Sequence, residues 1–302
     1  MFTSWALAEL ISKWVTYLSM LAVPGGFLIF MLAHRHQLDA GVRWHLLRRY
    51  LIPASVLGIV AVSSFFLIQV GSINQRGMAG MLDRDMGALL ASTALGDGLQ
   101  WRLNGFVLAL ASAGLWWLVL RAYRAKEQRK PLVMAGIAAL FACLALGISL
   151  AVLGHVASLT LPARVAVVLH LLAVSAWGGA LVPLLMLTRS TDLGGDVGSQ
   201  AGQARLISLL REYGQFGWAF IGVMLASGIY LLWLLFSEPF VEYGLHFFQY
   251  FYTVHVVFVI LALMFIRLPI FAVIGVALMR SAFLLLVKLT LLLVVLYISS
   301  PL

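Results

Sequence analysis

The stretch GHVASLTLPARVAVVLHLLAVSAWGGA, residues 154–180, carries two histidines and a Trp-Gly-Gly sequence among otherwise apolar residues. His170 and Trp177 are seven residues apart, so on a helix they lie on one face, almost in line. A histidine inside a membrane-spanning segment is costly and by default marks a functional site. The rest of the chain is therefore expected to bring partners to His155 and His170.

The composition on either side of this stretch is that of a membrane protein. Of the 302 residues, 63% are hydrophobic and 10% are charged, whereas soluble domains carry roughly 25% charged residues. A membrane-spanning helix needs about 20 mostly apolar residues, and the chain holds many such runs. We therefore predict an all-α integral membrane protein, one polytopic domain over residues 1–302 in the lipid bilayer. The single cysteine, Cys143, excludes an internal disulfide and a Cys-rich metal site.

Hydropathy predicts a bundle of about eight transmembrane helices, with a short interfacial helix over residues 2–12. Basic and base-poor loops alternate: 34–49 and 121–130 are rich in basic residues, whereas 237–246 has none. Because basic loops stay in the cytoplasm, we expect both termini to be periplasmic and the number of spans to be even. The same rule accounts for the formal net charge of +9. The predicted spans are residues 14–33, 48–71, 101–120, 131–153, 163–187, 214–236, 247–266 and 281–299.

Four of the seven histidines fall in the outer half of this predicted bundle. His155 and His246 lie near its outer surface, and His170 and His255 lie roughly 10–13 Å further in at 1.5 Å per residue. Imidazole binds copper, zinc, iron and haem alike, so the histidines alone do not name a metal. A hydrogen-bonded interior histidine is the alternative at each position, but for His155 and His170 together we favour a ligand or relay role. The other three, interpreted as interfacial polar residues, are His34, His36 and His45.

A predicted outer loop narrows the choice of metal. Residues 76–87 read RGMAGMLDRDMG and place three methionines beside two aspartates. Thioether sulfur is a soft ligand which, with thiolate, selects Cu(I). The alternative is an amphipathic helix lying on the membrane, and the sequence does not decide between the two. The candidate copper-capturing residues are Met78, Met81 and Met86, with Asp83 and Asp85 beside them.

Catalytic motifs are missing from the sequence. It has no serine elbow, no HExxH, no P-loop and no dinucleotide fingerprint. We therefore predict that the protein is not an enzyme, is not by itself an ATP-driven pump, and has no nucleic-acid partner.

The motifs in residues 154–180 resemble those of the copper resistance protein D family (CopD/PcoD-like inner-membrane proteins). Gly-His-Val at 154–156, then His170 and Trp-Gly-Gly at 177–179, is similar to that family's GHA followed by a helix of the form H-x6-W-x-G. The resemblance extends more weakly over nearly all 302 residues, with the family's signature region over about 154–302. Gln249 and Lys288 depart from it, since relatives carry a lysine near the first position and a glutamate in the last helix.

The resemblance implies a bacterial inner-membrane protein of about eight spans that transports or transfers copper, Cu(I) or Cu(II), in copper resistance or homeostasis. Its expected partner is a periplasmic copper-binding protein of the copper resistance C type. We expect the outer methionines to capture the ion and His155 and His170 to form the intramembrane site. His246 and His255 are candidate further ligands, and Trp177 is expected to pack on His170 and orient it.

Two other functions remain open. One is an electron-transfer subunit that holds b-type haem between histidines of different helices, such as His170 and His255. The other is a cofactor-free structural or assembly subunit of a larger membrane complex. A visible spectrum separates the first from copper binding, since Cu(I) bound by methionine and histidine is essentially colourless.

Overall fold

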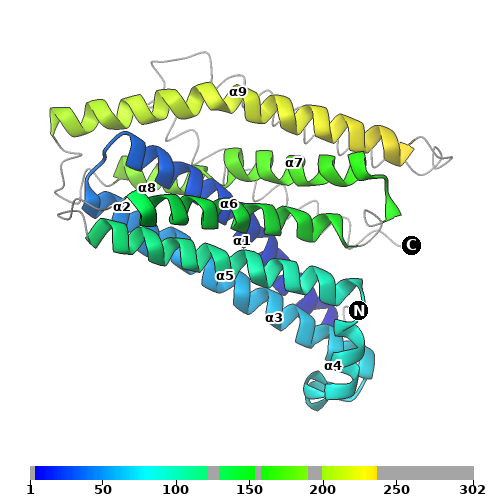
Figure 1. Ribbon diagram of the computed structural model, residues 1–302. Helices are drawn as coiled ribbons and strands as arrows, with labels where there is room; N and C mark the ends of the chain where they lie inside the picture. Colours follow the sequence, from blue (N-terminus) through cyan, green and yellow to red (C-terminus); the bar gives the residue numbers. More distant parts are fainter. Residues whose placement is uncertain (1–3, 122–128, 154–157, 190–198, 237–302) are drawn as a thin grey trace. The chain divides into compact units, whose positions relative to one another are not determined.

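A computed structural model describes residues 4–121, 129–153, 158–189 and 199–236 of the protein. All regular structure in these ranges is helical, with no strand among them, which confirms the predicted all-α class (Figure 1). These residues belong to one compact unit, Met1–Glu238. The last two predicted spans, 247–266 and 281–299, lie outside the described residues.

Six helical segments in the described ranges are long and apolar enough to cross a membrane, and they overlap the first six predicted spans. By length and composition this is the architecture of a multi-pass membrane protein. The six segments are α1 (Ser4–Arg35), α2 (Ala40–Leu46) continued by the π-helical turn η1 (Leu47–Leu51) and α3 (Ile52–Asn74), α5 (Ala94–Arg121), α6 (Arg129–Ala151), α7 (Leu161–Gly178) with α8 (Leu181–Arg189), and α9 (Gln200–Phe236).

Several helices begin earlier than hydropathy predicts. Residues 200–213, predicted as a loop, form the first turns of α9, and residues 40–47 are likewise helical. An interfacial helix was expected over residues 2–12, and its described part, residues 4–12, is instead the start of α1. Arginine and glutamate are good helix formers and remain solvated where a helix leaves the membrane, so an apolar window underestimates helix length there.

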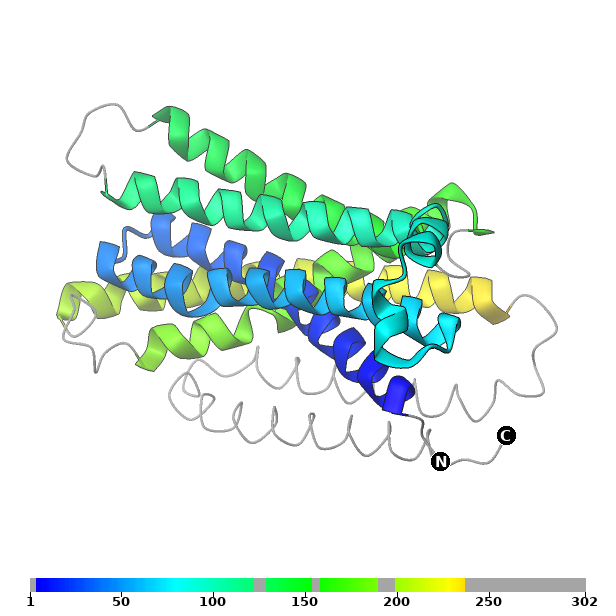
Figure 2. The ribbon, with the colours of Figure 1, turned by 90° about the horizontal axis from the view of Figure 1, so that it is seen from below.

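Packing between long helices makes up the bundle. α5 packs along both α3 and α6, and α1 packs against α3 and α7. α9 packs mainly against α7 (Figures 1 and 2). One end of the bundle holds the C-terminal ends of α1 and α5 and the start of α2. We call it the basic end because Arg35, Arg43 and Arg121 are there.

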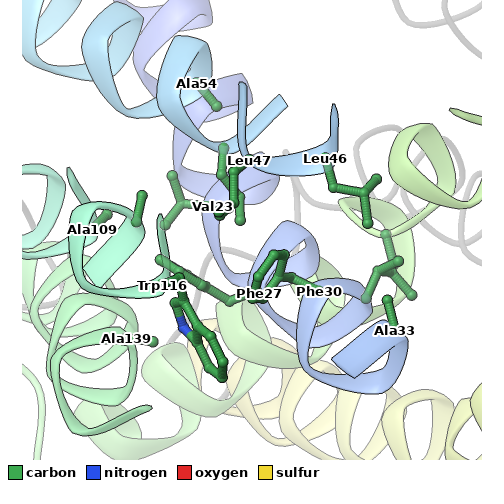
Figure 3. Packing of buried hydrophobic residues seen from close by; sticks show 14 of the residues in the cluster. Val23, Phe27, Phe30, Ala33, Leu46, Leu47, Ala54, Ala109, Trp116 and Ala139 are labelled. Atoms are coloured by element: carbon green, nitrogen blue, oxygen red, sulfur yellow. The ribbon is translucent and has the colours of Figure 1, made fainter. Parts of the chain in front are cut away.

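Aromatic side chains of α1 and α5 fill the core near the basic end (Figure 3). Phe30 is fully buried and meets the ring of Trp116 edge-on, with ring centroids 4.8 Å apart. Leu47 of η1 and Ala139 of α6 close the cluster from the other helices. Edge-to-face aromatic pairs of this kind contribute about 0.5–1.5 kcal/mol beyond the area they bury.

Glycine allows α1 and α7 to cross with their backbones in contact. A Cβ atom added at Gly179 would lie 1.9 Å from the carbonyl oxygen of Leu21, and one added at Gly25 would lie 2.3 Å from the carbonyl carbon of Gly179. Both distances are far below any real Cβ contact. The second glycine of the Trp-Gly-Gly sequence is therefore a packing residue, as small residues at membrane helix crossings generally are.

Candidate functional site

His170 is the predicted histidine ligand that falls within the described residues. It lies half-buried in α7 and faces α9. Its Nδ1 atom is 3.1 Å from the carbonyl oxygen of Met224 and 3.1 Å from Oγ of Ser227. Gly228 leaves room for the ring, because a Cβ there would lie 3.3 Å from Cε1 of His170. The imidazole is thus held against one turn of α9.

These contacts favour the tautomer of His170 that carries the proton on Nδ1. A carbonyl oxygen can only accept, so Nδ1 donates to Met224 when the ring is neutral. The Ser227 hydroxyl donates to the carbonyl of Val223 at 2.6 Å, which leaves its lone pairs toward the imidazole. Nε2 is then the nitrogen with the lone pair. A backbone carbonyl that accepts the other ring N–H is the usual environment of a histidine that binds a metal or haem.

The methionine-bearing residues 76–87 form two short helices, η2 (Gly77–Leu82) and α4 (Arg84–Ala91), which pack on α3 and α5. Met78 is 81% exposed. Met81 is half-buried and packs with Trp5 over Gly71, where an added Cβ would lie 2.6 Å from Cγ of Met81. Met86 is half-buried in α4. Of the three thioethers, Met78 has the exposure that capture of an ion from solution requires.

Asp83 caps the N-terminus of α4. Its Oδ1 atom accepts from the backbone N–H groups of Asp85 and Met86, at 3.1 Å each, and its Oδ2 accepts from Asn74 at 2.8 Å and from Arg76 at 3.4 Å. These hydrogen bonds hold the pKa of Asp83 below its ordinary value. The bond from the Met86 N–H has the largest effect, and the bond from the Asn74 side chain has the next largest. Both oxygens therefore serve the fold of this segment, whereas the Asp85 side chain is exposed.

Two tyrosines satisfy the carbonyl groups where α7 breaks into α8. The Tyr213 hydroxyl of α9 donates to the carbonyls of Trp177 at 2.8 Å and Ala176 at 3.2 Å. The Tyr50 hydroxyl of η1 donates to the carbonyl of Gly179 at 2.6 Å. Helix ends leave carbonyls without helical partners, so a break inside a membrane span needs such donors. The predicted stacking of the half-buried Trp177 ring on His170 stays a prediction.

Sequence reasoning missed these hydrogen-bond donors and acceptors around α7. Ser227-Gly228 was visible in the sequence only as a small-residue pair suited to helix packing. No local pattern marks Tyr213 or Tyr50, because their partners lie at least 36 residues away along the chain. A polar group inside an apolar run can be recognised in the sequence. The residue to which it hydrogen-bonds cannot.

The predicted metal ligands are only partly covered by the described ranges. In residues 4–121, 129–153, 158–189 and 199–236, no three His, Cys, Asp or Glu side chains converge as a metal-binding group. His155, His246 and His255 lie outside those ranges. The methionine segment lies against α3 and α5, and His170 lies against α9.

The fold and this histidine define a class: an all-α protein with the helices of a multi-pass membrane protein, in which a histidine of one such helix bonds through Nδ1 to a backbone carbonyl of another. Comparison of the chain with protein-family models, curated proteins and solved structures finds no match.

Proposed function

We propose that this protein binds copper at the bacterial inner membrane and transfers or transports it, in copper resistance or homeostasis. The observation that supports the proposal is the environment of His170, where a backbone carbonyl, that of Met224, lies 3.1 Å from Nδ1, as is usual for histidines that bind metals. The exposed thioether of Met78 supports capture of a soft ion. The resemblance of residues 154–180 to the copper resistance protein D family favours copper over other metals.

The proposed topology has eight spans, the six described segments followed by residues 247–266 and 281–299. Both termini are then periplasmic and the basic end faces the cytoplasm, as the positive-inside rule favours. Asn74 ends α3 and Ala94 begins α5, both at the end of the bundle away from the basic end. The segment between them, η2 and α4, would therefore be on the periplasmic side. Met78 would there meet a periplasmic copper-binding protein of the copper resistance C type.

In this proposal His170 shares the intramembrane site with other histidines. His155, His246 and His255 are the candidate further ligands, and Trp177 orients the ring of His170. Asp83 acts through the fold, since its cap holds the methionine segment on α3.

The test uses the full chain purified in detergent, titrated with Cu(I) against a chromophoric chelator and assayed for bound metal. His170→Ala is compared with His45→Ala, a half-buried histidine of α2 at the basic end. We expect the His170 variant to bind copper at least about tenfold more weakly, since even the loss of a hydrogen-bond partner of a metal ligand costs about 10–100-fold. The His45 variant should bind as wild type. Circular dichroism and gel filtration check that both variants remain folded.

A visible spectrum before and after dithionite decides between the proposal and its rivals. A Soret band with a sharp reduced α-band would assign His170 to b-type haem. Undiminished copper binding by the His170 variant would refute the site. No copper and no haem after a copper challenge would favour a structural or assembly subunit of a membrane complex.

A further inference from the structure

Tryptophan and arginine gather on one outward face of the basic end, where α2 and α5 are in contact. The rings of Trp44 and Trp117 lie with centroids 6.5 Å apart and planes inclined by 39°. The guanidinium carbon of Arg121 lies 4.0 Å from the centroid of Trp117. Such stacking holds the planar guanidinium in place and leaves its N–H groups able to bind another partner.

Two further arginines follow Trp44 along the same helix. Arg48 and Arg49 are both exposed and fall in η1. Two successive side chains are thus exposed in this π-helical turn. Through the described part of the chain, neither these two arginines nor Arg121 forms an ion pair with a carboxylate.

The acidic residues described at the basic end are engaged elsewhere. Asp39 caps α2 by accepting from the backbone N–H of Gly41. Glu212 of α9 binds Arg35 at 2.8 Å and His36 at 2.7 Å. Among the described residues, then, no carboxylate pairs with the arginines of this face, which we call the Trp–Arg face: Trp44, Trp117, Arg48, Arg49 and Arg121.

The depth of this face in a membrane follows from the sequence. Residues 50–73 and 103–120 contain no charged residue, and each run is close to the 20 residues that fill a hydrocarbon core. Arg48 and Arg49 precede the first run and Arg121 follows the second. All three lie where apolar helix meets lipid headgroups, the level at which tryptophan is also enriched.

An apolar ridge continues from the arginines into the membrane. Val56, Leu57 and Val60 of α3 are 43%, 53% and 55% exposed and begin two turns beyond Arg49. A ligand that combines an anionic group with long alkyl chains fits both parts, whereas free phosphate would use only the arginines.

We propose that Trp44, Trp117 and Arg121, with Arg48 and Arg49, form a binding site for the phosphate headgroup of an anionic phospholipid, with an acyl chain along Val56, Leu57 and Val60. Arginine forks match phosphate oxygens in pairs. Basic sites between transmembrane helices bind anionic lipids through this chemistry. The proposal rests on the helices lying in a bilayer and is independent of copper binding.

The test is a lipid titration of the metal-free full chain in detergent, followed by native mass spectrometry. Phosphatidylglycerol and phosphatidylcholine with the same acyl chains are compared, so the headgroup changes without any change in the protein. The variant R48Q/R121Q is matched by R84Q/R211Q, which removes the same charge from two other exposed arginines. Each arginine at an anionic headgroup contributes about fivefold, so R48Q/R121Q should bind phosphatidylglycerol about 25-fold more weakly. The control variant and His170→Ala should bind it as wild type.

Each remaining outcome overturns the proposal. Equal affinity of the wild type for the two lipids would show that the arginines do not bind the headgroup. Equal weakening in R84Q/R211Q would show that net charge, not this face, attracts the lipid. Displacement of the lipid by millimolar inorganic phosphate would make free phosphate the ligand. If R48Q/R121Q does not fold, R121K replaces it and should lose severalfold in affinity because lysine keeps the charge without the paired N–H groups.

Discussion

Replacing Gly179 by alanine tests whether the backbone contact between α1 and α7 holds the bundle together. The added Cβ would lie 1.9 Å from the Leu21 oxygen and 2.7 Å from the Leu21 carbonyl carbon. Real Cβ atoms essentially never come within 3.0 Å of such atoms. The two helices must therefore separate by roughly 1 Å, because the obstructing atoms are backbone and no rotamer change relieves the clash.

The cost follows from overpacking. Extra methyl groups in a packed core destabilise by about 1–3 kcal/mol, and a backbone clash at a helix crossing lies at the upper end. Separation of α1 from α7 would also lengthen the Tyr50 hydrogen bond to the Gly179 carbonyl. A loss of about 3 kcal/mol corresponds to a melting temperature roughly 6–12 °C lower, by the scaling for chains of 150–250 residues.

The chain provides both the reporter and the control for this measurement. Cys143 of α6 is the single cysteine, so a thiol-reactive fluorophore reports unfolding at one known position. Gly178→Ala is the matched control, since a Cβ at Gly178 meets no heavy atom within 4 Å. That variant should melt with the wild type or slightly above it, because alanine is favoured over glycine in helices by about 0.5–1 kcal/mol. Equal melting temperatures for the two alanine variants would refute the crossing geometry.

Two further predictions concern single polar side chains. Tyr213→Phe removes the donor to the Trp177 carbonyl and should destabilise by about 1–3 kcal/mol; Tyr230→Phe in the same helix should leave the melting temperature unchanged. The folded-state pKa of Asp83 is below its ordinary value, so the stabilisation it gives α4 is present at neutral pH and is lost as pH falls through that lowered pKa. Hydrogen exchange at the Met86 amide, corrected for intrinsic rate, should accelerate on acidification in the wild type and already be fast at neutral pH in Asp83→Ala; a protected Met86 amide in that variant would contradict the capping role.

Hydropathy anticipated the helices but not all of their ends. A membrane span depends on one continuous apolar run, which is local in sequence, so the first six predicted spans each overlap a helix. The start of α9 was missed because residues 200–213 are charged yet helical. There α9 is held by the ion pair of Glu212 with Arg35, whose partner is far away along the chain.

His170 illustrates which properties of the candidate site could be predicted from the sequence. The sequence identified a polar side chain in an apolar helix, which is a property of that residue and its neighbours. The contact with Met224 and Ser227, and hence the proton on Nδ1, depends on how α7 is rotated toward α9. Packing between helices sets that rotation, and hydropathy carries no information on it.

By itself, then, the sequence determined that the chain is helical and apolar enough to cross a membrane several times, because both properties are summed over neighbouring residues. Only the tertiary structure decided that Gly179 is a contact between helices, that Asp83 caps α4, and that Nδ1 of His170 bonds to the Met224 carbonyl. Each of these roles belongs to a pair of atoms, and all but the Asp83 cap join residues distant in sequence.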